Sequence, residues 1–212
     1  GKKLNLFSDY LFTHNKAVSK LYEKYIKSNI LATGAVRSNS VKINKKKVYD
    51  IGYVSTFRDI DPNMKLHKNY YYRDSIKAEF KLVKHLKRYC KEKNFLLGVI
   101  GSPENKLESQ KEKKYYDKIF GNNYIFFKNY DKRKTYSLID KFKVLVGIDS
   151  TLLYESFGRG NKTVFFSYRK MFYPFNSRKF GWPADLKLND KFWTSKRDFN
   201  SLKKIINTVY NC

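Results

Sequence analysis

The chain has 212 residues, of which 45 are lysine or arginine and 19 are aspartate or glutamate, so its formal net charge is +26. A hydrophobic fraction of 42% and an aromatic fraction of 17% are enough for the packed core of one sizeable domain, which excludes global disorder. No apolar run approaches the roughly 20 residues that span a bilayer and no secretory signal is recognisable, so any membrane contact is expected to be peripheral.

The charge and the cysteines indicate a class of partners and a compartment. A surface this basic attracts phosphates, nucleic acid or an anionic membrane face. Lysine supplies most of the charge and is accompanied by many Asn, Ile, Tyr and Phe residues, which is typical of an AT-rich genome, so we expect no specific nucleic-acid partner. Cys90 and Cys212 have neither metal-ligand nor disulfide spacing, which favours the cytoplasm, with the anionic inner face of the membrane as a peripheral contact.

The first part of the chain has the pattern of a small appendage. Residues 15–26 have the apolar spacing of a helix, and residues 29–34 form a short apolar run that ends at a glycine. The polar and basic stretch 38–47 is typical of a linker. We therefore predict a boundary after residue 46, with the main domain over residues 47–212.

Apolar runs and amphipathic stretches alternate through the main domain. Strands are predicted over residues 48–54, 95–100, 124–127, 144–148 and 163–167. Helices are predicted over residues 74–93, 109–120, 135–141, 152–159 and 198–209. The apolar face of the longest helix is expected to comprise Ile76, Phe80, Val83, Leu86, Tyr89 and Cys90. This alternation predicts an α/β fold, a Rossmann-like parallel sheet with helices on both faces, whose ligands bind at the carboxyl ends of the strands.

The turn after the fourth predicted strand is the best candidate for a ligand site. Asp149, Ser150 and Thr151 lie where a buried strand meets a helix, whose first amide groups and dipole attract an anion such as a diphosphate. Glu155 lies one helical turn beyond Thr151, where a carboxylate would accept both hydroxyls of a ribose. The alternative is that Asp149 or Ser150 only caps the helix and that Glu155 is only an exposed helical residue.

Three further turns lie at predicted carboxyl ends of strands. Ser55, Thr56 and Arg58 follow the first strand of the domain, and Arg58 would pair with a phosphate. Ser102 follows the second strand and would shape a base pocket, and Arg169 follows the fifth and would contact sugar or phosphate. Alternatively, each of these residues belongs to an ordinary turn that faces solvent and binds nothing.

The sequence contains no recognisable motif for binding a metal ion or a cofactor. His14, His67 and His85 are scattered without ligand spacing, so we expect no metal ion. The sequence has no G-x-G-x-x-G motif, no P-loop and no G-x-S-x-G elbow. We therefore expect no cofactor.

The block from residue 144 to residue 166 carries a family resemblance. It contains Asp149-Ser-Thr-Leu152, Tyr154-Glu155, then Gly158-Arg-Gly-Asn-Lys162 and a Phe-Phe strand. This pattern resembles the donor-binding domain of GT-B glycosyltransferases, and more narrowly the transferases of bacterial surface-carbohydrate biosynthesis. The resemblance implies that Ser150 and Thr151 contact the phosphates of a nucleotide-sugar and that Glu155 binds its ribose.

The resemblance also implies an organisation and a set of partners. Residues 1–46 would be the remnant of an N-terminal, acceptor-binding domain plus a linker, and 47–212 would be the nucleotide-sugar-binding domain, so we expect a fragment or reduced relative of the full enzyme. The donor would be a nucleotide-sugar, used as substrate without a metal, and the acceptor a carbohydrate or a lipid-linked one. The catalytic base would come from the N-terminal domain, and we name none.

Two other interpretations are compatible with the sequence. The same turn recurs more loosely in UDP-N-acetylglucosamine 2-epimerases and in polyol-phosphate transferases of wall-polymer synthesis. A non-enzymatic basic module would instead bind polyanions through its lysines alone.

Overall fold

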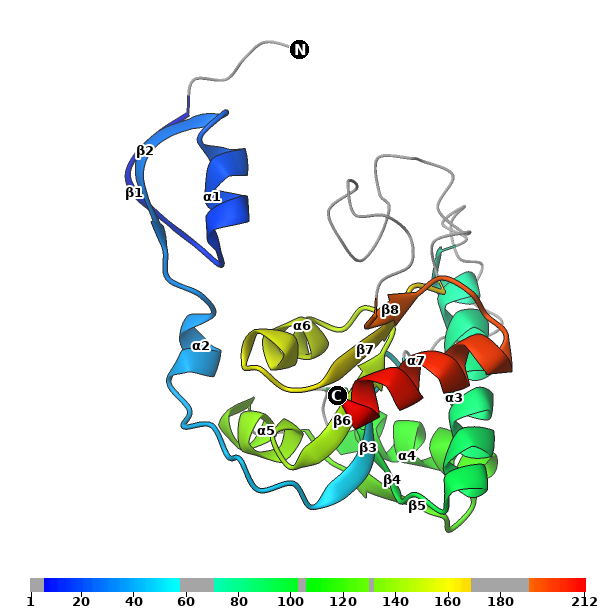
Figure 1. The fold of residues 1–212 in the computed structure, drawn as a ribbon. Coiled ribbons are helices and arrows are strands. Elements are labelled where there is room, and N and C mark those ends of the chain that lie inside the picture. Colours follow the sequence, from blue (N-terminus) through cyan, green and yellow to red (C-terminus); the bar gives the residue numbers. More distant parts are fainter. Residues whose placement is uncertain (1–5, 58–70, 103–105, 130–131, 169–190) are drawn as a thin grey trace. The chain divides into compact units, whose positions relative to one another are not determined.

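The computed structural model describes residues 6–57, 71–102, 106–129, 132–168 and 191–212. The chain divides into two compact units, Gly1–Lys42 and Ile43–Cys212 (Figure 1). The assignment of residues 1–46 to the remnant of another domain stays a prediction.

The N-terminal unit is built around a pair of parallel strands. Its elements are β1 (Leu6–Thr13), α1 (Lys16–Tyr22), β2 (Ile26–Ala32) and α2 (Val36–Asn39). Asn15 caps α1, because its side-chain oxygen accepts a hydrogen bond from the Val18 amide over 3.0 Å. The sequence did not predict β1, and the helix expected up to residue 26 ends at Tyr22 instead.

The second unit contains the strands and helices predicted for the main domain, with small shifts of their ends. The strands are β3 (Tyr49–Val54), β4 (Leu97–Ile100), β5 (Tyr124–Phe127), β6 (Phe142–Gly147), β7 (Thr163–Phe166) and β8 (Trp193–Thr194). The helices are α3 (Tyr71–Lys93), α4 (Lys106–Phe120), α5 (Lys132–Ile139), α6 (Thr151–Gly158) and α7 (Phe199–Asn211). The short strand β8 was not predicted from the sequence.

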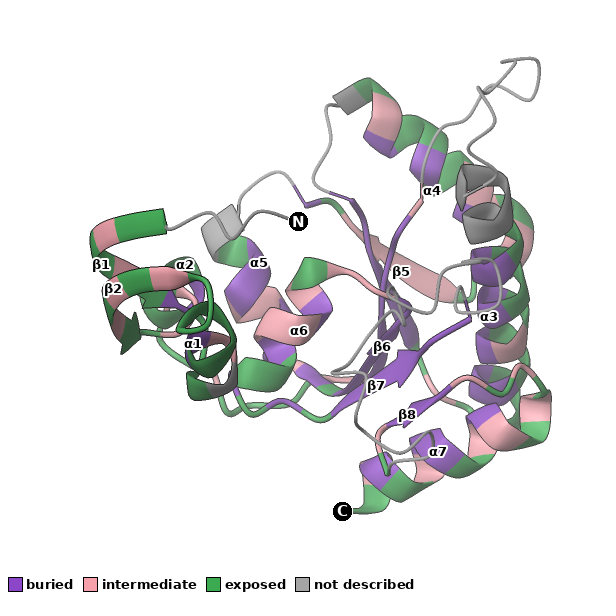
Figure 2. Cartoon of the chain, turned by 90° about the horizontal axis from the view of Figure 1, so that it is seen from above, coloured by how far each residue is buried: buried purple, intermediate pink, exposed green. Residues whose placement is uncertain are grey.

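All six strands form one parallel sheet in the order β5-β4-β3-β6-β7-β8. Numbered within this unit, the order is 3-2-1-4-5-6, that of a dinucleotide-binding doubly wound fold. The helices α3, α4 and α7 lie on one face of the sheet, and α5 and α6 on the other (Figures 1 and 2). The prediction of a Rossmann-like α/β fold is thus confirmed.

The main core lies between the sheet and the helices α3, α4 and α7. Its side chains come from alternate positions of the strands and from the inner faces of these helices. The strands β4, β6 and β7 are almost fully buried, as Figure 2 shows for β6 and β7. A strand covered on both faces has to be apolar throughout, which is why the sequence signal of these strands was a continuous apolar run.

One assignment on α3 was wrong. Phe80 was placed on the apolar face, but its side chain is 41% exposed and lies under the ammonium group of Lys84, whereas the neighbouring Glu79 is only 3% exposed. The buried face of the helix runs through Glu79, Val83 and Leu86. Burial of a carboxylate requires hydrogen-bonding partners, and those of Glu79 belong to the site described below.

A buried ion pair ties together the amino ends of β6 and β7. The Arg159 guanidinium donates to both carboxylate oxygens of Asp140, with an N–O distance of 2.6 Å to Oδ2, and Asn161 adds a side-chain bond of 2.8 Å to Oδ1. The backbone amide of Asn44 also donates to Asp140, and Lys47 donates to the Asp140 carbonyl. The segment leading into β3 is therefore anchored at the edge opposite to the carboxyl ends of the strands.

No helix in the described ranges is both long enough and apolar enough to cross a membrane.

Candidate functional site: the crevice between β3 and β6

The strand order places a topological switch point on the carboxyl edge of the sheet, where doubly wound folds have their ligand crevice. From β3 the chain winds outward through β4 to β5, and it then crosses back to β6 on the other side of β3. Tyr53 of β3 is paired with Val146 of β6, so the turns after these two strands begin side by side. Ligands of doubly wound folds bind at this switch point, where the connections diverge. The turns in question start at Ser55 and at Ile148.

The turn after β6 leads directly into α6. Ser150 is the N-cap residue of α6, with an extended backbone (φ −68, ψ 135), and its carbonyl accepts the Leu153 amide over 2.9 Å. Its side chain makes no capping hydrogen bond. Asp149 and Ser150 are half-buried and Thr151 is exposed. Ser150 thus occupies the N-cap position through its backbone, but its hydroxyl does not accept a hydrogen bond from the amide groups of the first turn.

A glycine at the end of β6 lets α6 start close to β3. A Cβ atom on Gly147 would lie 3.1 Å from Cδ2 of Leu153 and 3.2 Å from the carbonyl oxygen of Val54. Only a residue without a side chain allows this approach without displacing a neighbour. Leu153 in the first turn of α6 therefore packs closely on the end of β6, beside Val54 of β3.

Glu155 is neither buried nor fully exposed, and it has a protein partner. Its Oε2 accepts a hydrogen bond of 3.0 Å from the hydroxyl of Tyr136 on α5. Tyr136 is itself buried and packs against the Arg159 guanidinium, 5.5 Å from the ring centroid. The carboxylate is thus oriented by a rigid neighbour, an interaction that the sequence did not reveal.

The turn after β3 contains two hydroxyl side chains, of which one is hydrogen-bonded and the other is not. Ser55 is buried, shares a hydrogen bond of 2.7 Å with the Tyr116 hydroxyl, and accepts the Phe57 amide over 3.0 Å. Thr56 is also buried, but its Oγ1 makes no hydrogen bond within the described part of the chain. A buried hydroxyl without a partner is unfavourable, and such groups are found where a ligand or a water molecule supplies the missing bond.

Behind Ser55 lies a buried carboxylate that the sequence analysis missed. Oε1 of Glu79 accepts hydrogen bonds from Tyr53 (2.7 Å) and Tyr116 (2.5 Å). Burial raises the pKa of both tyrosines well above 10.0, and the charge of Glu79 raises it further. The available signal was the spacing of Glu79 with Val83 and Leu86, which puts it on the core face of α3.

Ser102 connects the turns after β3 and β4. Its amide donates to both carboxylate oxygens of the fully buried Glu112, at 3.1 and 3.0 Å, and its hydroxyl donates to the Phe57 carbonyl over 3.4 Å. Gly101 is needed beside it, because a Cβ there would lie 2.9 Å from Glu112 Oε2. Ser102 thus shapes the crevice mainly through the backbone.

A family model described as "putative O-antigen biosynthesis protein" matches residues 2–212. The chain belongs to this family. The family therefore connects the chain to surface-carbohydrate biosynthesis, as the resemblance had implied, but it does not specify a GT-B glycosyltransferase. No curated protein matched the chain.

The pairing of β3 with β6 places Ser55 and Thr56 beside the turn 149–151, and other candidates remain unplaced. Arg58 and Arg169 lie outside the described residues, so their predicted contacts stay predictions. The sequence also contains one Asp-x-Asp triplet, Asp59-Ile60-Asp61, which lies outside the described residues as well. Among the described residues, no group of three His, Cys, Asp or Glu side chains could hold a metal ion.

Proposed function

We propose that this chain is the donor-binding portion of a glycosyltransferase that transfers a sugar from a nucleotide-sugar to a growing surface polysaccharide or glycolipid. The observation that carries the proposal is the pairing of two hydroxyl-bearing turns across the β3–β6 switch point. One turn offers the buried, unengaged hydroxyl of Thr56, and the other offers Ser150 and Thr151 at the start of α6. The family description supports a role in the biosynthesis of surface carbohydrates.

In this proposal, the diphosphate of the donor lies at the amino end of α6. The first amide groups of the helix, its dipole and the hydroxyls of Thr56, Ser150 and Thr151 supply donors to the phosphate oxygens. Glu155, held by Tyr136, accepts the ribose hydroxyls with its carboxylate. When the glycosidic bond breaks, negative charge grows on the departing nucleotide, and fixed donors at that position stabilise it.

The buried network behind the crevice has a positioning role in this proposal. Glu79 fixes Tyr116, Tyr116 fixes the Ser55 hydroxyl, and Ser55 fixes the Phe57 amide. Every link is buried or half-buried, so residues 55–57 at the start of this turn are held in place before a ligand arrives. Preorganisation of this kind reduces the entropy lost on binding.

The proposal is tested by thermal shift with nucleoside diphosphates and their sugars, using UDP-, GDP-, CMP- and dTDP-linked compounds. We expect at least one compound to raise the melting temperature, and Glu155→Ala to abolish the gain. Glu92→Ala is the matched control, because Glu92 is also a helical carboxylate with hydrogen-bonding partners, but it lies near the end of α3 that leads to the amino edge of the sheet. A flat panel on folded protein, or a gain that survives Glu155→Ala, would contradict the proposal.

The same measurement separates a donor site from plain attraction of polyanions to a protein of charge +26. Polyanion binding falls steeply with salt and does not depend on Glu155. A nucleotide site saturates at a stoichiometry of one and is sensitive to Glu155.

A further inference from the structure

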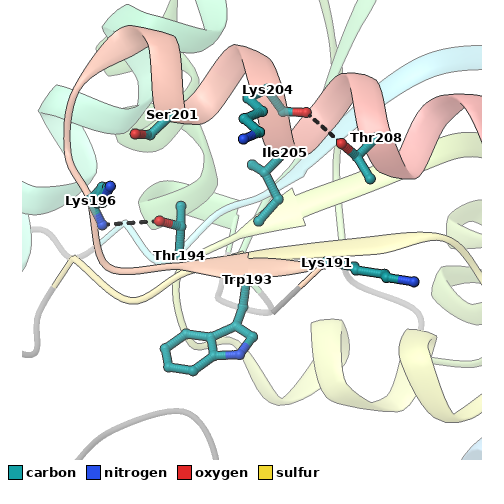
Figure 3. A pocket seen from close by; sticks show the side chains of 8 residues that line it. All are labelled: Lys191, Trp193, Thr194, Lys196, Ser201, Lys204, Ile205 and Thr208. Atoms are coloured by element: carbon teal, nitrogen blue, oxygen red, sulfur yellow. Dashed lines mark hydrogen bonds between the residues drawn. The ribbon is translucent and has the colours of Figure 1, made fainter. Parts of the chain in front are cut away.

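A second cavity lies away from the crevice, in the groove between the edge strand β8 and α7. Its volume is about 440 Å³, within the range of small-molecule sites. None of its lining residues belongs to the turns after β3 or β6. It lies on the α7 face of the sheet, at the end of the strand order (Figure 3).

The charged side chains that line this cavity are all cationic. Lys191 precedes β8, Lys196 follows it, and Lys204 comes from α7, so the three ammonium groups are contributed by three separate segments. No aspartate or glutamate lines the cavity. The Lys191 side chain extends away from the other two lysines (Figure 3), so an anion in the groove would be attracted mainly by the charges of Lys196 and Lys204.

The nearest acidic residues are already occupied by other groups. Asp198 caps α7 and accepts the amide and the hydroxyl of Ser201, both at 2.8 Å. Glu92 accepts Arg88 at 2.9 Å and Lys203 at 2.8 Å. Within the described part of the chain, neither Lys196 nor Lys204 forms a salt bridge. Hydrogen bonds from Ser201, and to a lesser extent the charge of Lys196, lower the pKa of Asp198, but neither ammonium group forms a hydrogen bond or an ion pair among the described residues, so both can still contact a ligand.

The remaining lining residues give the cavity a rigid wall and a neutral donor. The Thr194 oxygen accepts the Lys196 amide over 3.1 Å, which fixes the turn after β8 and leaves the hydroxyl proton of Thr194 to donate. Ile205 points from α7 toward β8 and is almost fully buried, so it forms an apolar floor (Figure 3). The ring of Trp193 lies on the other side of β8.

We propose that this groove is a binding site for a phosphate-bearing small molecule, separate from the nucleotide crevice. Lysine ammonium groups bind phosphate as point charges, and the cavity is large enough for an organic group attached to the phosphate. The same chemistry could be presented by a soluble phosphorylated compound or by a lipid headgroup. The inference does not rest on the proposed donor site.

The test uses Trp193 as a reporter, because it is one of the lining residues of the cavity, although its ring lies on the other side of β8. The chain has two tryptophans, so Trp182→Phe leaves Trp193 as the single emitter. Inorganic pyrophosphate is titrated into this variant, with calorimetry on the unaltered protein as a second measurement. We expect a saturable change in emission, weakened at least tenfold in affinity by adding Lys196→Gln and Lys204→Gln, and unchanged by adding Glu155→Ala.

The control lowers the net charge equally at another helix. Lys114→Gln with Lys118→Gln removes two exposed lysines from α4. An equal loss of affinity in this control would overturn the proposal, as would the absence of saturable binding by both methods. Vesicles of phosphatidylglycerol distinguish a lipid headgroup from a soluble phosphorylated compound. Vesicle binding that pyrophosphate displaces supports a headgroup in the groove. Vesicle binding that pyrophosphate does not displace, and that leaves the Trp193 emission unchanged, overturns the proposal in favour of a flat basic surface.

Discussion

The hydroxyl of Tyr136 on α5 donates a hydrogen bond of 3.0 Å to Oε2 of Glu155 on α6. This bond joins the residue that the sequence had selected as a ribose ligand to a buried aromatic side chain that the sequence had not selected. The bond is compatible with two roles for Glu155. The residue either binds ribose while Tyr136 orients its carboxylate, or it only stabilises the fold as a partner of Tyr136.

Tyr136→Phe separates these explanations. Loss of a hydrogen bond to a charged group is expected to lower the free energy of unfolding by about 1.5–3 kcal/mol. If Glu155 binds ribose, the freed carboxylate is less well oriented, and the affinity for the stabilising nucleotide falls as well. Nucleotide titration of the Tyr136→Phe protein measures this, and an unchanged affinity combined with reduced stability would identify Glu155 as structural.

Thr56→Val removes a buried hydroxyl that has no hydrogen-bonding partner among the residues that the structure describes. The variant is expected to be as stable as the original protein, or more stable by about 1 kcal/mol, while losing affinity for the nucleotide. Thr163→Val is the matched control, because the Thr163 hydroxyl is also buried but donates to the Asn161 carbonyl over 2.9 Å. We expect that control to be destabilised by about 1 kcal/mol and to keep its affinity. Urea unfolding and nucleotide titration of both variants check the pair.

High pH is expected to destabilise the protein through Tyr53 and Tyr116. Burial and the charge of Glu79 raise the pKa of both tyrosines well above 10.0 in the folded state. The unfolded chain therefore loses these protons first, so the stabilising contribution is complete below about pH 10 and is lost as the pH rises further. Unfolding measured between pH 8 and pH 11 should show this decline, and Tyr53→Phe should make it shallower. A slope that is the same in both proteins would contradict the assignment.

The ion pair between Asp140 and Arg159 is expected to be important for stability. Asp140→Ala would leave the buried guanidinium without its partner and lower the free energy of unfolding by about 3–5 kcal/mol. Burial alone would raise the pKa of Asp140, but hydrogen bonds from Arg159, Asn161 and the Asn44 amide lower it. The contribution is therefore present above about pH 4, the ordinary value for aspartate, and is lost as the pH falls through the lowered pKa. Denaturation at pH 7 and pH 3 checks both statements, with Lys113 and Asp117 as an exposed ion pair whose loss should have little effect.

Gly147→Ala tests whether α6 must approach β3 closely. The added methyl group would crowd Leu153 and the Val54 carbonyl, which is expected to reduce stability by about 1–3 kcal/mol and to shift the start of α6. Gly158→Ala, at the other end of the same helix, meets no atom within 4 Å and should be neutral or slightly stabilising. Unfolding and nucleotide titration of both variants compare the two sites.

The sequence did not allow the buried network behind Ser55 to be recognised. Phe80 was taken as part of the apolar face of α3 because it is an aromatic residue, and Glu79 was passed over because it is charged. The structure has the opposite arrangement, since Tyr53 and Tyr116 come from β3 and α4 to meet the carboxylate. Their hydrogen bonds offset the loss of water around Glu79, and no periodicity on α3 itself indicates that such partners exist.

The two strands that were missed also had no local signal. β8 contains only Trp193 and Thr194, which is too short for any alternation, and it is a strand only because β7 lies beside it. β1 has exposed apolar residues and becomes regular by pairing with β2. Strand pairing is decided by a partner elsewhere in the chain, so a short edge strand cannot be identified from its own residues.

Local features of the chain were enough to predict the fold class, the five longer strands of the sheet and the hydroxyl-rich turn at the start of α6, because these depend on apolar runs, helical spacing and turn residues. The return of β6 to the side of β3, which brings the turn with Thr56 beside the turn with Ser150, and the hydrogen bond from Tyr136 to Glu155 became visible in the folded chain alone. Contacts between distant segments depend on the order in which strands pair, and many orders are compatible with the same alternation of strands and helices.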